Sequence, residues 1–170
     1  MNMLDRFFSI EYEEKGDPFQ NLSIWRKEEY RKLQGTYPVL FLSFAGVKSD
    51  NYVDAREQIF QIITDLFSKN EYLRDSGKLG EKDKEFFDRV GREMSNSTAS
   101  MAIHELTGYL FRYYEKKVII LLDEYDTPLQ EAYVGGYWEE LVSLMRNLFK
   151  FDRLIREGGQ RHPGEWIWAV

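Results

Sequence analysis

Lys117 to Leu129 reads KVIILLDEYDTPL, and this stretch decides the fold. Its apolar run, Val118 to Leu122, shows no polar alternation, which is typical of a strand buried on both faces of a parallel sheet. Two acids, Asp123 and Glu124, end the run, and Pro128 predicts that the chain turns there. The sequence therefore predicts carboxylates at the carboxyl end of a strand, where open α/β sheets place their ligand crevice.

A hydrophobic strand that ends in Asp-Glu resembles the Walker B motif. In that arrangement the aspartate, here Asp123, supports Mg²⁺ through water, because Mg²⁺ takes few carboxylates and keeps several waters. Side chains alternate along a strand, so Glu124 points elsewhere and can polarise a water for attack on a γ-phosphate. The alternative is that both acids only mark the point at which the strand reaches solvent.

Length and composition bound the class of protein. At 170 residues the chain is one domain or part of one, and 43% hydrophobic residues are enough for a core. A formal net charge of -6 does not indicate a broad nucleic-acid-binding face. The absence of cysteine excludes disulfides and thiolate metal sites. Without a signal peptide or an apolar run of bilayer length, we expect a cytoplasmic protein with no membrane partner.

A second apolar strand is predicted from Tyr37 to Phe44, and it also reads as buried. Lys48 follows its carboxyl end and could face a phosphate, although a solvated loop lysine is the simpler interpretation. Helical patterns separate this strand from Val118 to Leu122. The order of strand, helices and strand predicts a crossover unit and hence a parallel pair.

The remaining elements follow from apolar periodicity and turn residues. The polar connection SGKLGEKDK at 76–84 contains Gly-Lys but lacks the other residues of a phosphate loop. The ending at 165–170 is predicted as either a short strand or an apolar tail. We expect helices at 1–10, 53–70, 85–94, from the N-cap candidates 95–98 to about 114, and at 137–149, with a Gly-Gly turn at 132–137.

Three segments together resemble a bacterial family of predicted AAA-ATPase-like P-loop proteins, often joined to a PD-(D/E)XK nuclease-like domain. They are YPVLFLSFAGVK (37–48), KVIILLDEYDTPL (117–129) and AYVGGY (132–137). The resemblance implies that Asp123 is the magnesium-side acid and Glu124 the catalytic, water-activating one. It places Asp126 in the family's own extension of the motif, as a further candidate metal ligand, and makes MNMLDRFFS (1–9) resemble the helix that follows the phosphate loop.

The chain departs from this pattern in two respects, since no G-x-x-x-x-G-K-[ST] occurs in it and residues 151–170 do not resemble the family. That loop supplies the backbone cradle and lysine for the phosphates and a hydroxyl for Mg²⁺. We therefore predict a partial P-loop NTPase-like α/β three-layer fold, with neighbouring parallel strands near 38–44 and 118–122 and an incomplete sheet. Residues 1–150 would be the partial ATPase-like domain and 151–170 a divergent tail, as expected of a truncated reading frame or a remnant scaffold.

Three functions are compatible with these observations. The first is an ATPase fragment whose parent family uses Mg²⁺ and ATP, with Asp123 and Lys48 on the nucleotide side, but which is inactive alone. The second is a non-enzymatic interaction module that binds a missing ATPase segment or a second copy, because an incomplete sheet leaves open edges. The third is a metal-dependent nuclease with Asp123, Glu124 and Asp126 as ligands, although two-metal sites need carboxylates from several elements.

Overall fold

The two predicted strands are neighbours in a parallel sheet. The computed structural model describes residues 3–13, 17–149 and 166–169. Strand β1 (Val39–Ser43) pairs in parallel with β2 (Val118–Asp123), and β3 (Trp166–Ala169) pairs in parallel with the other side of β2, giving the order β1-β2-β3. The predicted α/β class, parallel pairing and incomplete sheet are confirmed, and the chain's ending forms a short strand.

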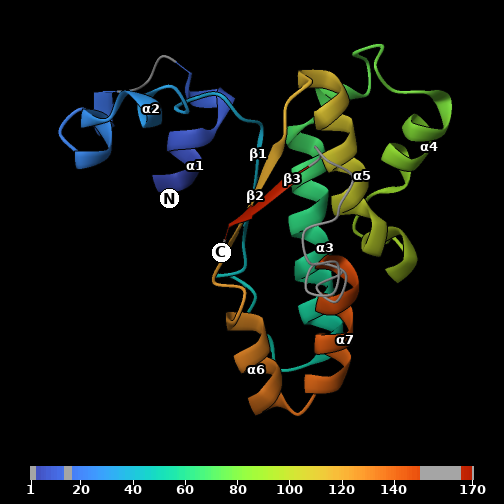
Figure 1. Ribbon diagram of the computed structural model, residues 1–170. Coiled ribbons are helices and arrows are strands. Elements are labelled where there is room, and N and C mark those ends of the chain that lie inside the picture. The colour runs from blue at the N-terminus through green and yellow to red at the C-terminus, as the bar shows by residue number, and fades with distance from the viewer. Residues whose placement is uncertain (1–2, 14–16, 150–165, 170) are drawn as a thin grey trace, which may run out of the picture.

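Helices flank this sheet unequally (Figure 1). Three long helices, α3, α5 and α7, lie on one side of it, with α4 outside them, whereas α1 and α2 lie on the other side. Helix α6 lies at the end of the sheet where β2 finishes. The helices are α1 (Met3–Phe8), α2 (Glu28–Arg31), α3 (Tyr52–Lys69), α4 (Glu81–Arg89), α5 (Asn96–Tyr114), α6 (Thr127–Gly135) and α7 (Trp138–Phe149), and short 3₁₀ turns span Ile10–Tyr12, Asp17–Phe19, Ser23–Arg26 and Glu71–Leu73. None of the helices in the described ranges is both long and apolar enough to cross a membrane.

Side-chain caps fix where the two longest helices begin. The Asn51 side chain accepts a hydrogen bond from the Asp54 backbone N–H at 3.0 Å before α3. The Ser95 hydroxyl accepts one from the Thr98 N–H at 3.0 Å before α5, as the sequence predicts. Such caps satisfy backbone donors that have no partner within the helix, so each stabilises its helix start by about 1 kcal/mol.

The hydrophobic core lies between the sheet and the three long helices. Leu40 and Leu42 of β1 are each 1% exposed, and they join the alternate residues of β2 against these helices. Fully burying one such leucine is worth roughly 1.5–3 kcal/mol, so this layer dominates the stability of the fold. The core residues with the lowest exposure include Phe60, Leu106, Tyr109, Ile120 and Leu141.

The expectation that β1 is buried on both faces is wrong. Its residues alternate between half-buried and buried, whereas Val118 to Leu122 of β2 are all buried. The physical reason is position: β2 has a strand on each side, but β1 is the outer strand and its second face carries little cover. Val39 and Phe41 occupy that second face and remain half-buried.

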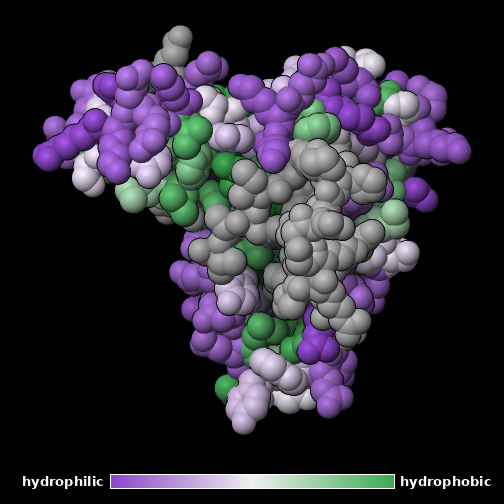
Figure 2. Space-filling view, viewed as in Figure 1, coloured by the Kyte–Doolittle hydropathy of each residue, from purple (hydrophilic) through white to green (hydrophobic). Residues whose placement is uncertain are grey.

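A smaller aromatic cluster closes the amino end of β1. Phe7 packs edge-on against Phe8 and Phe19, each at 5.1 Å between ring centroids, and Phe8 also contacts Tyr37. Ser9 forms a parallel bridge with Tyr37, which places the end of α1 beside the start of β1. In Figure 2 hydrophilic side chains cover α2 and the α4 end of the molecule, and hydrophobic side chains lie beside α1.

The expected turn at Pro128 and the Gly-Gly turn over 132–137 are corrected by α6. This helix runs Thr127–Gly135 and carries Pro128 in its first turn, where the missing proline N–H has no helical partner to lose. Gly136 and Tyr137 form the connection to α7, and the φ of 76° at Gly136 is the left-handed conformation that glycine adopts freely. Helix α4 also begins earlier than expected, at Glu81.

Candidate functional site

Asp123 is the last residue of the central strand. It lies in register with Ser43 of β1, and its carbonyl oxygen accepts a hydrogen bond from the Phe44 N–H at 2.9 Å. The residues before it are buried, but Asp123 itself is half-buried. The apolar strand therefore delivers one carboxylate to the point where the sheet meets solvent, at the carboxyl end of the parallel strands.

Glu124 ends the strand through an unusual backbone conformation. Its φ is 51°, in the left-handed region, and its side chain is exposed. The Thr127 N–H donates to the Glu124 carbonyl at 3.1 Å, which closes a tight turn before α6. A non-glycine residue in this region costs about 1–2 kcal/mol, and such strain clusters at functional sites.

Asp126 begins α6. Its carbonyl accepts from the Gln130 N–H at 2.9 Å, and its carboxylate accepts from the Gln130 side-chain amide, also at 2.9 Å. Asp126 occupies the N-cap position of α6, but its exposed side chain bonds to the Gln130 side chain and caps no backbone N–H. Within the described ranges no group of three or more His, Asp or Glu residues is arranged to hold a metal ion.

The loop at 44–51 carries Lys48 to the same end of the sheet as Asp123, because parallel strands share their carboxyl ends. The Lys48 side chain is exposed, while its backbone N–H donates to Gln58 Oε1 at 3.2 Å. Gln58 Nε2 donates in turn to Ser49 Oγ at 2.8 Å. The structure therefore places the loop of Lys48 at the same end of the sheet as the acids and fixes its backbone to α3.

Sequence reasoning missed a group that joins this loop to the α6–α7 connection. The hydroxyl of Tyr137 donates to the Ser49 carbonyl, and the Tyr137 ring is 6% exposed. The sequence signal for this group is the motif AYVGGY, whose Gly-Gly pair predicts a turn and not a contact. The last tyrosine of that motif makes a buried contact to a residue distant in sequence.

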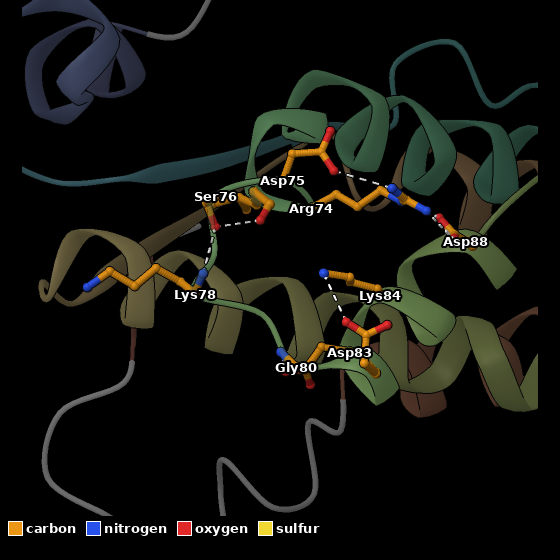
Figure 3. A network of polar contacts seen from close by, with 10 residues as sticks. Arg74, Asp75, Ser76, Lys78, Gly80, Asp83, Lys84 and Asp88 are labelled. Carbon is orange, nitrogen blue, oxygen red and sulfur yellow. Dashed lines mark hydrogen bonds and ion pairs between the residues drawn. The ribbon is translucent and has the colours of Figure 1, made fainter.

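The Gly-Lys pair of the 76–84 connection lies elsewhere. In Figure 1 the loop before α4 is at the end of the molecule opposite α6, and Figure 3 shows it surrounded by polar contacts. Arg74 binds both carboxylate oxygens of Asp88, at 2.7 and 2.9 Å, and the Gly80 N–H donates to the Asp83 carboxylate at 3.0 Å. The Lys78 ammonium lies 3.7 Å from Glu115. These contacts attach α4 to its neighbours. The Gly-Lys pair therefore lies away from the end of the sheet that carries Asp123 and Glu124, which we call the acid end.

The fold and the acid end together define an α/β domain with a parallel sheet and a strand-terminal Asp-Glu pair. A family model described as predicted AAA-ATPase matches residues 1–157, so the chain belongs to the AAA-ATPase-like family. No curated protein and no solved structure matches the chain. The domain boundary expected at residue 150 stays a prediction, since it falls at the edge of the described residues.

Proposed function

We propose that this chain is a partial ATPase domain of the cytoplasm that retains the Walker B acids but does not hydrolyse ATP by itself. The observation that carries the proposal is the place of Asp123 at the carboxyl end of the central parallel strand, followed directly by Glu124. In this proposal Asp123 supports Mg²⁺ and Glu124 activates the attacking water, with Asp126 as a further metal-side acid and Lys48 on the phosphate side.

The residues present fit only half of a magnesium–ATP site. The half-buried carboxylate of Asp123 and the neighbouring exposed acids suit a hydrated Mg²⁺. The phosphate side does not fit, because no G-x-x-x-x-G-K-[ST] loop supplies backbone donors and a lysine. When bound, magnesium would neutralise phosphate charge, but no hydrolytic step is assigned to this chain alone.

Calorimetry with Mg·ATP tests this proposal on two proteins, the 170-residue chain and a chain extended upstream through a phosphate loop. We expect binding only in the extended protein, and loss of its turnover in Glu124→Gln with binding retained. Tight binding by the 170-residue chain would contradict the proposal, because another loop would then hold the phosphates. Turnover by that chain would contradict it as well.

The open edge of β1 favours a second candidate, an interaction module. The Pro38 carbonyl accepts from the Ile119 N–H at 3.0 Å and the Phe44 N–H donates to Asp123, so the even-numbered residues pair with β2. The backbone N–H and C=O groups of Val39, Phe41 and Ser43 therefore point away from β2. Among the described residues, Ser9 forms the one bridge on this side, and it reaches only Tyr37 at the start of the strand. Such an edge can accept a strand from the missing ATPase segment or from a second copy.

Light scattering with Ser43→Pro tests this second candidate. The substitution removes an N–H from the outer edge and leaves the bonds to β2, so we expect any oligomer to dissociate while the fold persists. A monodisperse monomer of the unmodified chain over a wide concentration range would exclude self-association. The nuclease hypothesis is not proposed further, since no described metal cluster supports it.

A further inference from the structure

Two segments far apart in the sequence meet at the acid end of the sheet. The loop at 44–51 follows β1, and the connection between α6 and α7 follows the Asp-Glu pair. The Tyr137 hydroxyl donates to the Ser49 carbonyl oxygen at 2.5 Å, across 88 positions of sequence. In Figure 1 both segments lie at the end of the molecule that carries α6.

The Tyr137 ring is enclosed by its own connection and by the loop. A Cβ atom on Gly135 would lie 2.6 Å from Cε1 of this ring and 3.2 Å from the carbonyl oxygen of Asp50. The Tyr137 N–H donates to the Ala132 carbonyl at 3.0 Å, which fixes the backbone beneath the ring. Burial raises the pKa of the Tyr137 hydroxyl above its ordinary value of 10.0, so the group stays a hydrogen-bond donor beyond the range in which an exposed tyrosine does.

Ser49 is held from a second direction by α3. Gln58 on that helix donates from Nε2 to Ser49 Oγ at 2.8 Å and accepts at Oε1 from the Lys48 N–H at 3.2 Å. The loop is thus held by helix α3 on one side and by the α6–α7 connection on the other. The contact from Tyr137 is the one that leads back to the acids. Tyr137 follows the end of α6, and Asp126, the N-cap of α6, comes two residues after Glu124.

We propose that Tyr137 is a positioning residue, which holds the Lys48 loop in a fixed place relative to Asp123 and Glu124. The link runs from the acids through α6 to the Tyr137 hydroxyl and from there to Ser49. The part of the inference that concerns metal and phosphate rests on the proposed function, because it takes Asp123 as the magnesium-side acid. The mechanical part, that Tyr137 orders the loop, stands on the contacts alone.

Tyr137→Phe tests the link, with Tyr133→Phe as the matched control. Both changes remove one hydroxyl from the same segment, but Tyr133 is 76% exposed. In Tyr137→Phe we expect the amides of the 46–50 loop to exchange with solvent about three- to tenfold faster, the factor that losing one hydrogen bond gives. The amides of β2 should keep their protection, and Tyr133→Phe should change neither region.

A Mg²⁺ titration followed by amide NMR chemical shifts tests the positioning role separately. If Tyr137 contributed only to stability, its removal would not change which amides respond to Mg²⁺. In the unmodified chain we expect Mg²⁺ to shift the amides of 123–126 and, through the link, those of 46–50. In Tyr137→Phe the first set should still respond and the second should not.

The outcomes separate the two ideas. Unchanged loop exchange in Tyr137→Phe overturns the inference, whatever Mg²⁺ does, and so does a loop response to Mg²⁺ that persists in this variant. Faster exchange spread evenly over β2 and the loop also overturns it, because Tyr137 would then stabilise the whole fold. Absence of any Mg²⁺ response at 123–126 counts against the proposed function and against the metal part of the inference, while the exchange result still decides whether Tyr137 orders the loop.

Discussion

The Phe44 N–H donates a hydrogen bond to the Asp123 carbonyl oxygen at 2.9 Å, one residue beyond the end of β1. This bond extends the pairing of the two strands to the level of the acid. The loop that follows Phe44 consequently leaves the sheet beside Asp123. Backbone pairing thus brings the two parts of the candidate site together before any side chain contributes.

Gly135→Ala should destabilise the fold by about 1–3 kcal/mol, the usual cost of overpacking. The reason is that the new methyl group would meet the Tyr137 ring at 2.6 Å, and the ring cannot move away without breaking its bond to Ser49. Urea unfolding at neutral pH measures the change. Gly108→Ala in α5 is the control, because a Cβ there would meet no atom within 4 Å outside its chain neighbours and the nearby backbone of its own helix, and helix propensity should add about 0.5–1 kcal/mol of stability.

Phe44→Ala should cost about 3–5 kcal/mol, whereas Phe41→Ala should cost clearly less. Phe44 is 1% exposed and packs edge-on against Phe149 at 6.0 Å between ring centroids, but Phe41 lies on the half-buried face of β1. Truncation leaves a cavity only where the surroundings are closed. Denaturant unfolding of the matched pair checks this, and equal losses would show that the second face of β1 is as well covered as the first.

The sequence predicted those features that depend on local pattern. The unbroken apolar run of Val118 to Leu122 correctly indicated a strand buried on both faces, and its Asp-Glu ending located the acid end of the sheet. The similar run in β1 misled, because apolar residues alone do not reveal that a strand lies at the edge. Pro128 misled for the opposite reason, since proline both ends helices and suits their first turn.

The part of the site that could not be predicted depends on contacts between distant residues. Tyr137 bonds to a backbone carbonyl, and every residue has one, so no side-chain pattern marks Ser49 as its partner. The positive φ of Glu124 is equally hidden, because glutamate has no preference for that conformation. Periodicity identifies which face of an element is buried, but it carries no information on which loops meet.

Asp88→Asn should lower stability at neutral pH and have a smaller effect in acid. Hydrogen bonds from Arg74 hold the pKa of the Asp88 carboxyl below its ordinary value of 3.8. A carboxyl with a lowered folded-state pKa stabilises the fold above its unfolded pKa, and that contribution is lost as the pH falls through the folded value. Thermal unfolding of both proteins from neutral pH to below 3.8 checks this. A difference that stayed constant over this range would contradict the role of the ion pair.

Glu124→Gly should raise the free energy of unfolding by a few tenths to about 1 kcal/mol. Glycine removes the cost of the left-handed conformation at φ 51°, about 1–2 kcal/mol, and part of this gain is offset by the greater freedom of glycine in the unfolded chain. Glu124→Val should destabilise, because a β-branched residue is strained at positive φ.

Glu115→Gly, at φ 54° after α5, is the matched control, and urea unfolding should give it a gain of the same sign. If both glycine variants gain stability and only Glu124→Gly abolishes turnover in the chain extended through a phosphate loop, the strain at Glu124 is explained by its side chain's role rather than by the fold. A loss of stability in Glu124→Gly would mean that the glutamate side chain stabilises the turn, and the strain would then need no functional reason.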